Sequence, residues 1–319
     1  MEWKKKKLRP AIITHDCIQA EITFDRLFVV RSDHSLWMLY PFTSEMWLEF
    51  REKRGRNLSF TIPKFTKIME NVEQITASAM TIAAVKTDHS LWLWNHCGKE
   101  SPKFVEYAGN IQMAASDESG LMALAQTGKV FFWKREEQQY CQDADMIMDE
   151  VLSISAGVDF YVAVRKDGSL WTWGRNDCGQ LGDGSRSNRS NPVKILEDVI
   201  QVSLGARHGA AVDRNHNLWI WGENSFGQLC RGNCKDAAEP IKVADNVKKV
   251  SLGYSHTGYL TMDNQLWMAG FNGKYGSLGD GKTVNRDWPV LIGERIKDVA
   301  LGADRAVCVD AQDDTAVWG

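Results

Sequence analysis

The sequence predicts an all-β protein, a closed ring in the form of a seven-bladed β-propeller with four-stranded antiparallel blades. Three observations predict it. A tryptophan-rich pattern recurs along the whole chain, turn-forming residues keep a constant distance from each copy, and alternations of β-branched and apolar residues fill the intervals. A four-stranded unit buries little surface alone, whereas units stacked in a ring cover one another's faces.

The recurring pattern has the form Leu-Trp-x-Trp-Gly and contains ten of the 13 tryptophans. It is clearest at residues 170–174 and 218–222. The first aromatic position of each copy falls at residue 37, 92, 131, 171, 219, 267 or 316, so successive copies are 55, 39, 40, 48, 48 and 49 residues apart. Seven copies with a period near fifty indicate one repeat per blade.

Two kinds of turn residue keep a fixed distance from that first aromatic position. Fourteen residues before it, the last four copies carry glycine and the first three do not: Gly157, Gly205, Gly253 and Gly302 against Thr23, Ser78 and Asp117. Three residues before it stands a residue suited to the positive φ of a tight hairpin. These residues are His34, His89, Gly128, Gly168, His216, Asn264 and Asp313.

Each repeat is expected to open with a strand, led by proline at 192–195, 240–243 and 289–292. The predicted organisation is a basic tail over residues 1–9 and one propeller over residues 10–319. Its repeats are expected at roughly 10–40, 62–95, 102–134, 146–174, 192–222, 240–270 and 289–319. Residues 10–13 resemble a repeat-opening strand, so we expect them to complete the last blade and bring the two chain ends together.

Composition narrows the class of protein. The chain has 38 basic and 41 acidic residues, a net charge of −3, which disfavours binding to nucleic acid through phosphates. No apolar run is long enough to cross a bilayer, and no apolar stretch follows the basic start as in a signal peptide. The seven scattered cysteines indicate reduced thiols. We therefore expect a monomeric cytoplasmic protein, or a nuclear one if the source is a eukaryote.

Three segments carry a family resemblance. Residues 173–184 read Trp-Gly-Arg-Asn-Asp-Cys-Gly-Gln-Leu-Gly-Asp-Gly, and residues 221–229 and 270–281 are similar. They resemble the signature of the regulator of chromosome condensation repeat, as do the Gly-x-x-His elements at 205–208 and 253–256. The resemblance extends from about residue 150 to the end, is faint before it, and is stronger to bacterial members. It implies a seven-bladed propeller with guanine-nucleotide exchange, chromatin contact or scaffolding as its activity.

Strand direction predicts which face of the ring binds a partner. In antiparallel order, the turn at 205–208 and the Gly-Gln-Leu-Gly loop lie at the same end of a blade, which we call face A. The short turns, with those at 197–198 and 245–246, lie at the opposite end, face B. Long loops on a rigid ring are where binding residues gather. The candidate partner-binding residues are Trp47, Arg51, Lys53, Arg54, Arg56, Arg207, His208 and His256.

Several of these signals also have a structural interpretation. His208 and His256 lie at strand starts that recur around the ring, where packing competes with partner contact. The paired tryptophans recur in nearly every blade, which favours packing between blades over base stacking. The basic stretch at 51–56 has two interpretations: it contacts a partner, or it is a solvated loop without a binding role.

No constellation typical of catalysis is present, and we predict no cofactor and no metal site. Cys230 and Cys234 have no second pair nearby, and Asp183 and Asp280 lack the alternating carboxylates of a calcium loop. The predicted function is a protein-interaction scaffold and not an enzyme. One alternative is a guanine-nucleotide exchange factor for a small GTPase, and a second is a chromatin or nucleic-acid binder.

Overall fold

The computed structural model describes residues 11–14, 17–22, 26–40, 65–77, 81–95, 105–117, 119–136, 139–141, 143–312 and 315–318. Strands and turns account for the regular structure in these ranges. Nothing within them forms a helix with the length and apolar character needed to cross a membrane.

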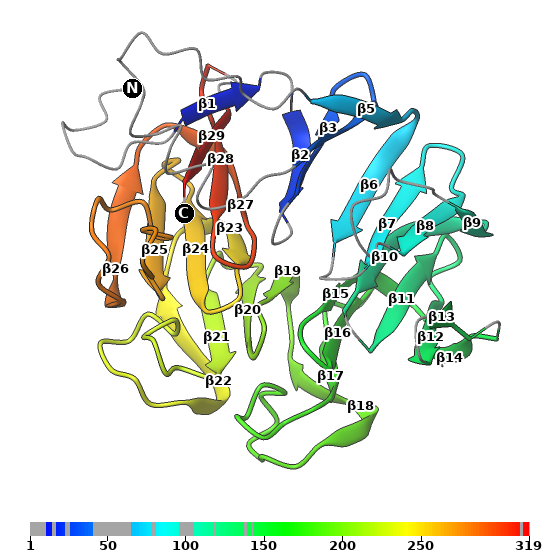
Figure 1. Ribbon diagram of the computed structural model, residues 1–319. Coiled ribbons are helices and arrows are strands. Elements are labelled where there is room, and N and C mark those ends of the chain that lie inside the picture. The colour runs from blue at the N-terminus through cyan, green and yellow to red at the C-terminus, as the bar shows by residue number, and fades with distance from the viewer. Residues whose placement is uncertain are drawn as a thin grey trace, which may run out of the picture.

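Six blades consist of four antiparallel strands each, and the blades surround a common centre (Figure 1). From the inner to the outer strand, three of them are β2 (Cys17–Ile22), β3 (Leu27–Arg31), β4 (Leu36–Leu39) and β5 (Thr66–Met69); β6 (Val72–Ala77), β7 (Thr81–Lys86), β8 (Leu91–Asn95) and β9 (Val105–Ala108); and β15 (Val151–Ala156), β16 (Phe160–Arg165), β17 (Leu170–Gly174) and β18 (Arg189–Leu196). The other three are β19 (Val199–Leu204), β20 (His208–Asp213), β21 (Leu218–Gly222) and β22 (Ala237–Ala244); β23 (Val247–Leu252), β24 (His256–Thr261), β25 (Leu266–Gly270) and β26 (Arg286–Gly293); and β27 (Ile296–Leu301), β28 (Ala306–Asp310), β29 (Thr315–Trp318) and β1 (Ala11–Thr14).

The prediction of seven four-stranded blades is wrong, because the structure has six blades of that kind. The sheet of residues 111–148 has five strands instead: β10 (Ile111–Ser116), β11 (Gly120–Ala125), β12 (Val130–Glu136), β13 (Gln139–Tyr140) and β14 (Asp145–Met148). β12 is longer than the third strand of the blades above, and its far end pairs with β13 while its near end pairs with β14. The hydroxyl of Tyr140 in β13 donates to Thr81 Oγ1 at 2.9 Å, which anchors the extra strand on the preceding blade.

The predicted turn residues adopt the expected backbone. His34, His89 and His216 have φ near +60°, and Gly128 and Gly168 near +84°. Asn264 has a φ of 59°. These residues occupy the turns between the second and third strands, which confirms that the offset of three residues marks a tight hairpin.

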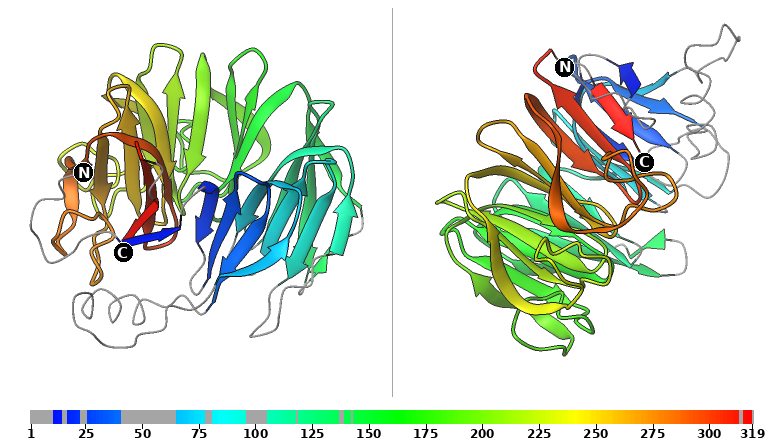
Figure 2. Two further views of the ribbon diagram at one scale, coloured as in Figure 1. Left: turned by 90° about the horizontal axis from the view of Figure 1, so that it is seen from above. Right: turned by 90° about the vertical axis from the view of Figure 1, so that its left-hand side faces the viewer.

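The ring closes between the two ends of the chain, as predicted. β1 pairs antiparallel with β29, with Ala11 opposite Val317, so residues 11–14 form the outer strand of the last blade. Both views of Figure 2 show this blue strand beside the red one. The proline-led strands β18, β22 and β26 pair with the strand before them, so each blade begins at its inner strand and ends one strand into the next predicted repeat.

The tryptophans pack between blades and against turns, as predicted. Trp221 has no exposed surface, and its indole N–H donates to the carbonyl oxygen of Gln180 in the preceding blade at 2.8 Å. Trp318 donates in the same way to the carbonyl oxygen of Ser277 at 3.1 Å. The first tryptophan of a pattern is held differently, since the indole of Trp37 donates to Ser35 Oγ within the turn.

Candidate partner-binding face

Two sets of loops form face A. One set follows the inner strands, as at 205–207 and 253–255, and the other joins the third strand to the outer strand at 175–188, 223–236 and 271–285. Register places both sets at the same end of a blade, because His208 pairs with Gly222 and Gly222 with Ala237. Face B carries only short turns, such as those at 197–198, 245–246 and 294–295. Among the described loops, the predicted difference between the faces is confirmed.

A buried asparagine fixes the backbone of each long loop. Asn224 donates to the carbonyl oxygens of Asn233 and Lys235 at 2.7 and 3.0 Å, and its own side-chain oxygen accepts the N–H of Leu229 at 2.8 Å. Asn176 and Asn272 make equivalent bonds in their loops, and none of the three has exposed surface. Because a buried amide strongly favours full satisfaction, these loops hold one backbone shape.

A glycine before each asparagine starts the loop. Gly222 has a φ of 100°, and a Cβ added there would lie 2.5 Å from the carbonyl oxygen of Arg207. Gly174 and Gly270 have the same conformation. Only glycine fits this left-handed backbone against so close a neighbour, which explains the Trp-Gly-x-Asn pattern.

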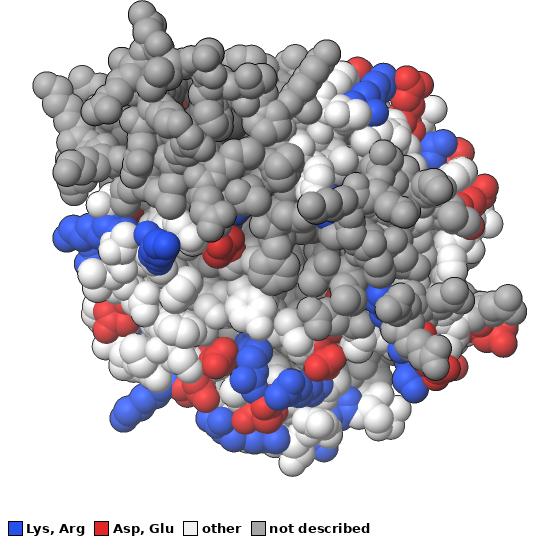
Figure 3. All heavy atoms as spheres, in the orientation of Figure 1, with Lys and Arg blue, Asp and Glu red and all other residues white. Residues whose placement is uncertain are grey.

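An ionic cluster lies where the loops of two neighbouring blades meet. Asp177 in the 175–188 loop pairs with Arg175 at 2.9 Å and with Arg207 of the next blade. The hydrogen bond from Arg175, with that from Arg207, holds the pKa of Asp177 well below its usual range. Figure 3 shows blue and red side chains intermixed in the lower part of the view, over the elements from β17 to β22. Exposed ion pairs add little stability, so the main effect of this cluster is to orient charged groups at the surface.

The structure separates the candidate partner-binding residues into three groups. Arg207 belongs to the ionic cluster, with its side chain 28% exposed. His208 and His256 have no exposed surface and present nothing to a partner in this conformation. The remaining candidates, Trp47, Arg51, Lys53, Arg54 and Arg56, lie outside the described residues.

The two histidines occupy space that a glycine leaves empty. A Cβ added to Gly205 would lie 2.3 Å from Cε1 of His208, and one added to Gly253 would lie 2.2 Å from Cε1 of His256. Phe160 fills the same place over Gly157. The Gly-x-x-His element is therefore a packing unit between the inner strand and the strand that follows it, in which an apolar ring serves equally.

The buried histidines predict acid sensitivity. Burial lowers the pKa of His208 to about 3 and that of His256 to about 4, and the nearby His256 adds to the effect at His208. An unfolded histidine titrates near 6.5, so the unfolded chain binds more protons than the folded chain between about pH 6.5 and pH 4. The contribution of the two histidines to the free energy of unfolding should therefore be complete above about pH 6.5. It should fall as the pH decreases below that value, by up to about 1.4 kcal/mol per histidine per pH unit.

Urea unfolding at stepped pH measures this slope. His208→Phe, which copies Phe160 at the equivalent position, should reduce it. His216→Asn, which copies Asn264 in a face B turn, should leave it unchanged. If the free energy of unfolding changed equally with pH in the parent protein and in His208→Phe, the acid sensitivity would not come from His208.

The aspartates that the sequence analysis considered as metal ligands bind other side chains. Asp183 and Asp280 pair with Arg189 and Arg286 at 2.8 and 2.7 Å and accept bonds from the loop asparagines. Cys230 is buried and Cys234 exposed. Across the part of the chain that the structure describes, no three His, Cys, Asp or Glu side chains are grouped to hold a metal ion.

Sequence reasoning missed one feature of face A, a cavity on the ring axis. The inner strands enclose about 370 Å³ there, and Glu21 and Ser116 line it. The repeats contained a signal for it. At the position 16 residues before the first aromatic position, the first copy has an acid, Glu21, whereas every other copy has a small or hydroxyl-bearing residue.

Comparison with known proteins agrees with this architecture. Models of the regulator of chromosome condensation (RCC1) repeat match residues 167–212 and 215–260, and a second model of this repeat matches 151–180 and 199–228. Prp20p from Saccharomyces cerevisiae, described for its binding properties to Gsp1p and histones, superposes with a TM-score of 0.73 at 16% identity, over 95% of this chain and 82% of that one.

Two further solved structures are similar. Human WBSCR16 has a TM-score of 0.73 at 16% identity, over 96% of this chain and 87% of that one. The CRINKLY WD40 ectodomain of the Arabidopsis thaliana receptor kinase ACR4 has a TM-score of 0.58 at 13% identity, over 96% of each chain. At such identities the likeness shows the fold alone.

The repeated four-stranded sheets, the Gly-x-x-His packing units and the asparagine-held loops define a β-propeller. Within the chain, residues 151–260 match the regulator of chromosome condensation (RCC1) repeat.

Proposed function

We propose that this chain is a protein-interaction scaffold that binds a macromolecular partner over face A. The observation that carries the proposal is the difference between the faces in the part of the chain that the structure describes: face A has long loops held by buried asparagines and an arginine-bearing ionic cluster, whereas face B has short turns. Loops held on a rigid scaffold suit binding, because little conformational freedom is lost when a partner docks. Arginine and aromatic side chains dominate the energetics of such interfaces.

The position of the basic segment 51–56 in the chain supports the proposal that face A binds the partner. It belongs to the connection between β4 and β5, the third and outer strands of their blade, which is the kind of connection that forms the long loops at 175–188 and 223–236. Trp47 precedes it in the same connection. This connection carries the strongest candidate residues for partner contact.

Charge reversal tests the proposal. The triple variant Arg51→Glu, Arg54→Glu and Arg56→Glu should abolish capture of the main partner in an affinity pull-down from native lysate, read by mass spectrometry. Its thermal transition should stay unchanged, since charged arginine side chains contribute little to a hydrophobic core. The matched variant Lys86→Glu with Lys166→Glu, on the face B side, should keep the partner. Loss of the partner only in the face B variant would show that the opposite face binds.

A second candidate function is guanine-nucleotide exchange on a small GTPase. The RCC1 repeats and the fold shared with Prp20p favour it. An exchange factor accelerates release by favouring the nucleotide-free state of its partner. Release of fluorescent GDP from a panel of small GTPases, with and without this protein, distinguishes exchange from plain scaffolding. Gel shifts at several salt concentrations test the nucleic-acid alternative, which the net charge of −3 disfavours.

A further inference from the structure

The axial cavity opens toward face A and is floored toward face B. At the floor, glutamine amides join neighbouring inner strands: Gln19 bonds the backbone of Ile75 at 2.8 and 3.0 Å, and Gln74 bonds that of Ala114 at 3.0 and 2.9 Å. At the mouth, the lining includes Gly157, Gly205, Gly253 and Gly302, with Tyr254 after the third of them.

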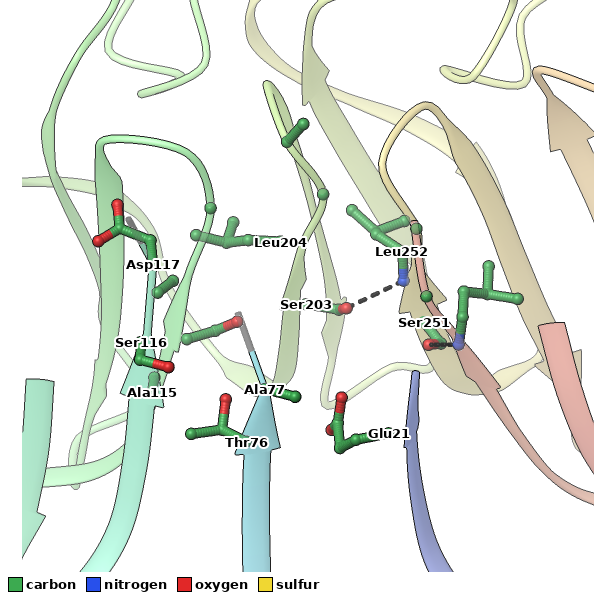
Figure 4. A pocket seen from close by; sticks show the side chains of 18 of the residues that line it. Glu21, Thr76, Ala77, Ala115, Ser116, Asp117, Ser203, Leu204, Ser251 and Leu252 are labelled. Carbon is green, nitrogen blue, oxygen red and sulfur yellow. Dashed lines mark hydrogen bonds between the residues drawn. The ribbon is translucent and has the colours of Figure 1, made fainter. Parts of the chain in front are cut away.

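The wall between floor and mouth is mildly polar, with one acid among hydroxyl and methyl groups. Ser203 and Ser251 each accept the N–H of the neighbouring inner strand, from Leu252 at 3.1 Å and from Leu301 at 3.0 Å. At the equivalent level on β2 stands Glu21, whose carboxyl group faces the space between the strands (Figure 4). Withdrawal from bulk water raises the pKa of Glu21 to about 7, although Gln19 and the charge of Lys249 act in the opposite direction.

Two further observations indicate that this part of the cavity is a ligand-binding site. Ser116 is only 8% exposed, yet its hydroxyl has no hydrogen-bond partner, and Figure 4 shows it directed into the cavity. Lys249, whose charge acts on Glu21, is paired with Asp298. The wall therefore offers the carboxyl group of Glu21 and a buried hydroxyl that still lacks a hydrogen-bond partner.

The other acid of the cavity wall is already occupied. Asp117 at the mouth accepts the backbone N–H groups of Gly120 and Asp159, both at 2.8 Å, and the hydroxyl of Tyr161 at 3.0 Å. It links two blades at the position where two other repeats have the glycine of the Gly-x-x-His element. Among the described residues that line the cavity, Glu21 is therefore the acid available to a ligand.

We infer that the axial cavity binds a single organic cation, the ammonium or guanidinium group of a lysine or arginine side chain inserted from a partner on face A. The cation pairs with Glu21 and donates to Ser116 Oγ, while Ala77, Ala115 and Leu204 contact the apolar stem of the side chain. The volume of about 370 Å³ lies within the range of small-ligand pockets. The inference rests on the proposed function, since docking on face A brings such a side chain to the mouth.

Calorimetric titration of the full chain tests the inference without a known partner. The probes are n-butylammonium and n-propylguanidinium, which reproduce the two side chains, and n-butanol as their neutral counterpart. We expect saturable binding of both cations and none of butanol. Binding of butanol as tight as that of butylammonium, or no binding of either cation, would overturn the inference.

Variants locate the site. Glu21→Gln should weaken butylammonium binding about tenfold or more, because it removes a charge-assisted hydrogen bond. Ser116→Ala should weaken it several-fold. Glu197→Gln removes an exposed carboxylate at a face B turn and should leave affinity unchanged. Thermal melting checks that each variant is folded, and unaltered affinity in folded Glu21→Gln would refute the assignment.

A diamine distinguishes a side chain from a free metabolite. Since Asp117 is occupied, 1,4-diaminobutane should bind no more than a few-fold tighter than butylammonium. Binding a hundredfold tighter would assign the cavity to free diamines instead. The face A triple variant should bind butylammonium normally, so failure of the cavity inference and failure of the face A proposal give different results.

Discussion

Replacing Trp221 with alanine is expected to lower the free energy of unfolding by about 3–5 kcal/mol. This indole is completely buried between two blades, so the change creates a cavity that the rigid strands cannot fill. It also removes the hydrogen bond to the carbonyl oxygen of Gln180, which holds the long loop of the preceding blade. Denaturant unfolding followed by tryptophan fluorescence and circular dichroism measures the loss.

Trp288 provides a matched control for the same substitution. Its side chain lies on the outer strand β26 and is 64% exposed, so Trp288→Ala should change the free energy of unfolding by no more than about 0.5 kcal/mol. Similar losses in the two variants would show that the recurring indoles do not hold the blades together.

Removal of residues 1–14 is expected to lower the melting temperature by about 5–10 °C. The deletion removes β1, which leaves the backbone of β29 unpaired at the outer edge of the last blade. Differential scanning calorimetry measures the shift. A shorter deletion of residues 1–9 keeps β1 and should melt close to the full chain. Equal melting temperatures for all three proteins would show that pairing of β1 with β29 contributes nothing to stability.

The regular part of the fold could be predicted from sequence because its signals are local. The positive φ of His34 and Asn264 and the glycine at Gly205 follow from turn chemistry repeated at constant distances. Closure was predicted by the same logic, because residues 10–13 resemble a repeat-opening strand, and the structure has that strand at residues 11–14.

The irregular part depends on contacts between distant residues. The fifth strand of the sheet at 111–148 exists because Tyr140 reaches Thr81 of the preceding blade, a contact that no repeat pattern records. The assignment of His208 and His256 to partner contact had a similar cause. A histidine motif near a binding loop looks the same in sequence whether its ring points outward or packs over a glycine, and here it packs inward.

The axial cavity combines a local sequence signal with a contact between distant residues. Glu21 stands out at its repeat position, so its sequence signal was available. Its meaning required the structure, because only the ring brings Glu21 and Ser116 to the wall of one cavity although they lie in distant repeats.

The pairing of Ala11 with Val317 also has a consequence for biosynthesis. β1 is the first described strand to be translated, and its partner β29 is the last. Blades completed earlier can form by local hairpins, but the final blade must wait for a contact of very high sequence separation, which is slow to form. A nascent chain therefore passes through an open arc with two unprotected sheet edges, the stage at which chaperone binding and aggregation compete with folding.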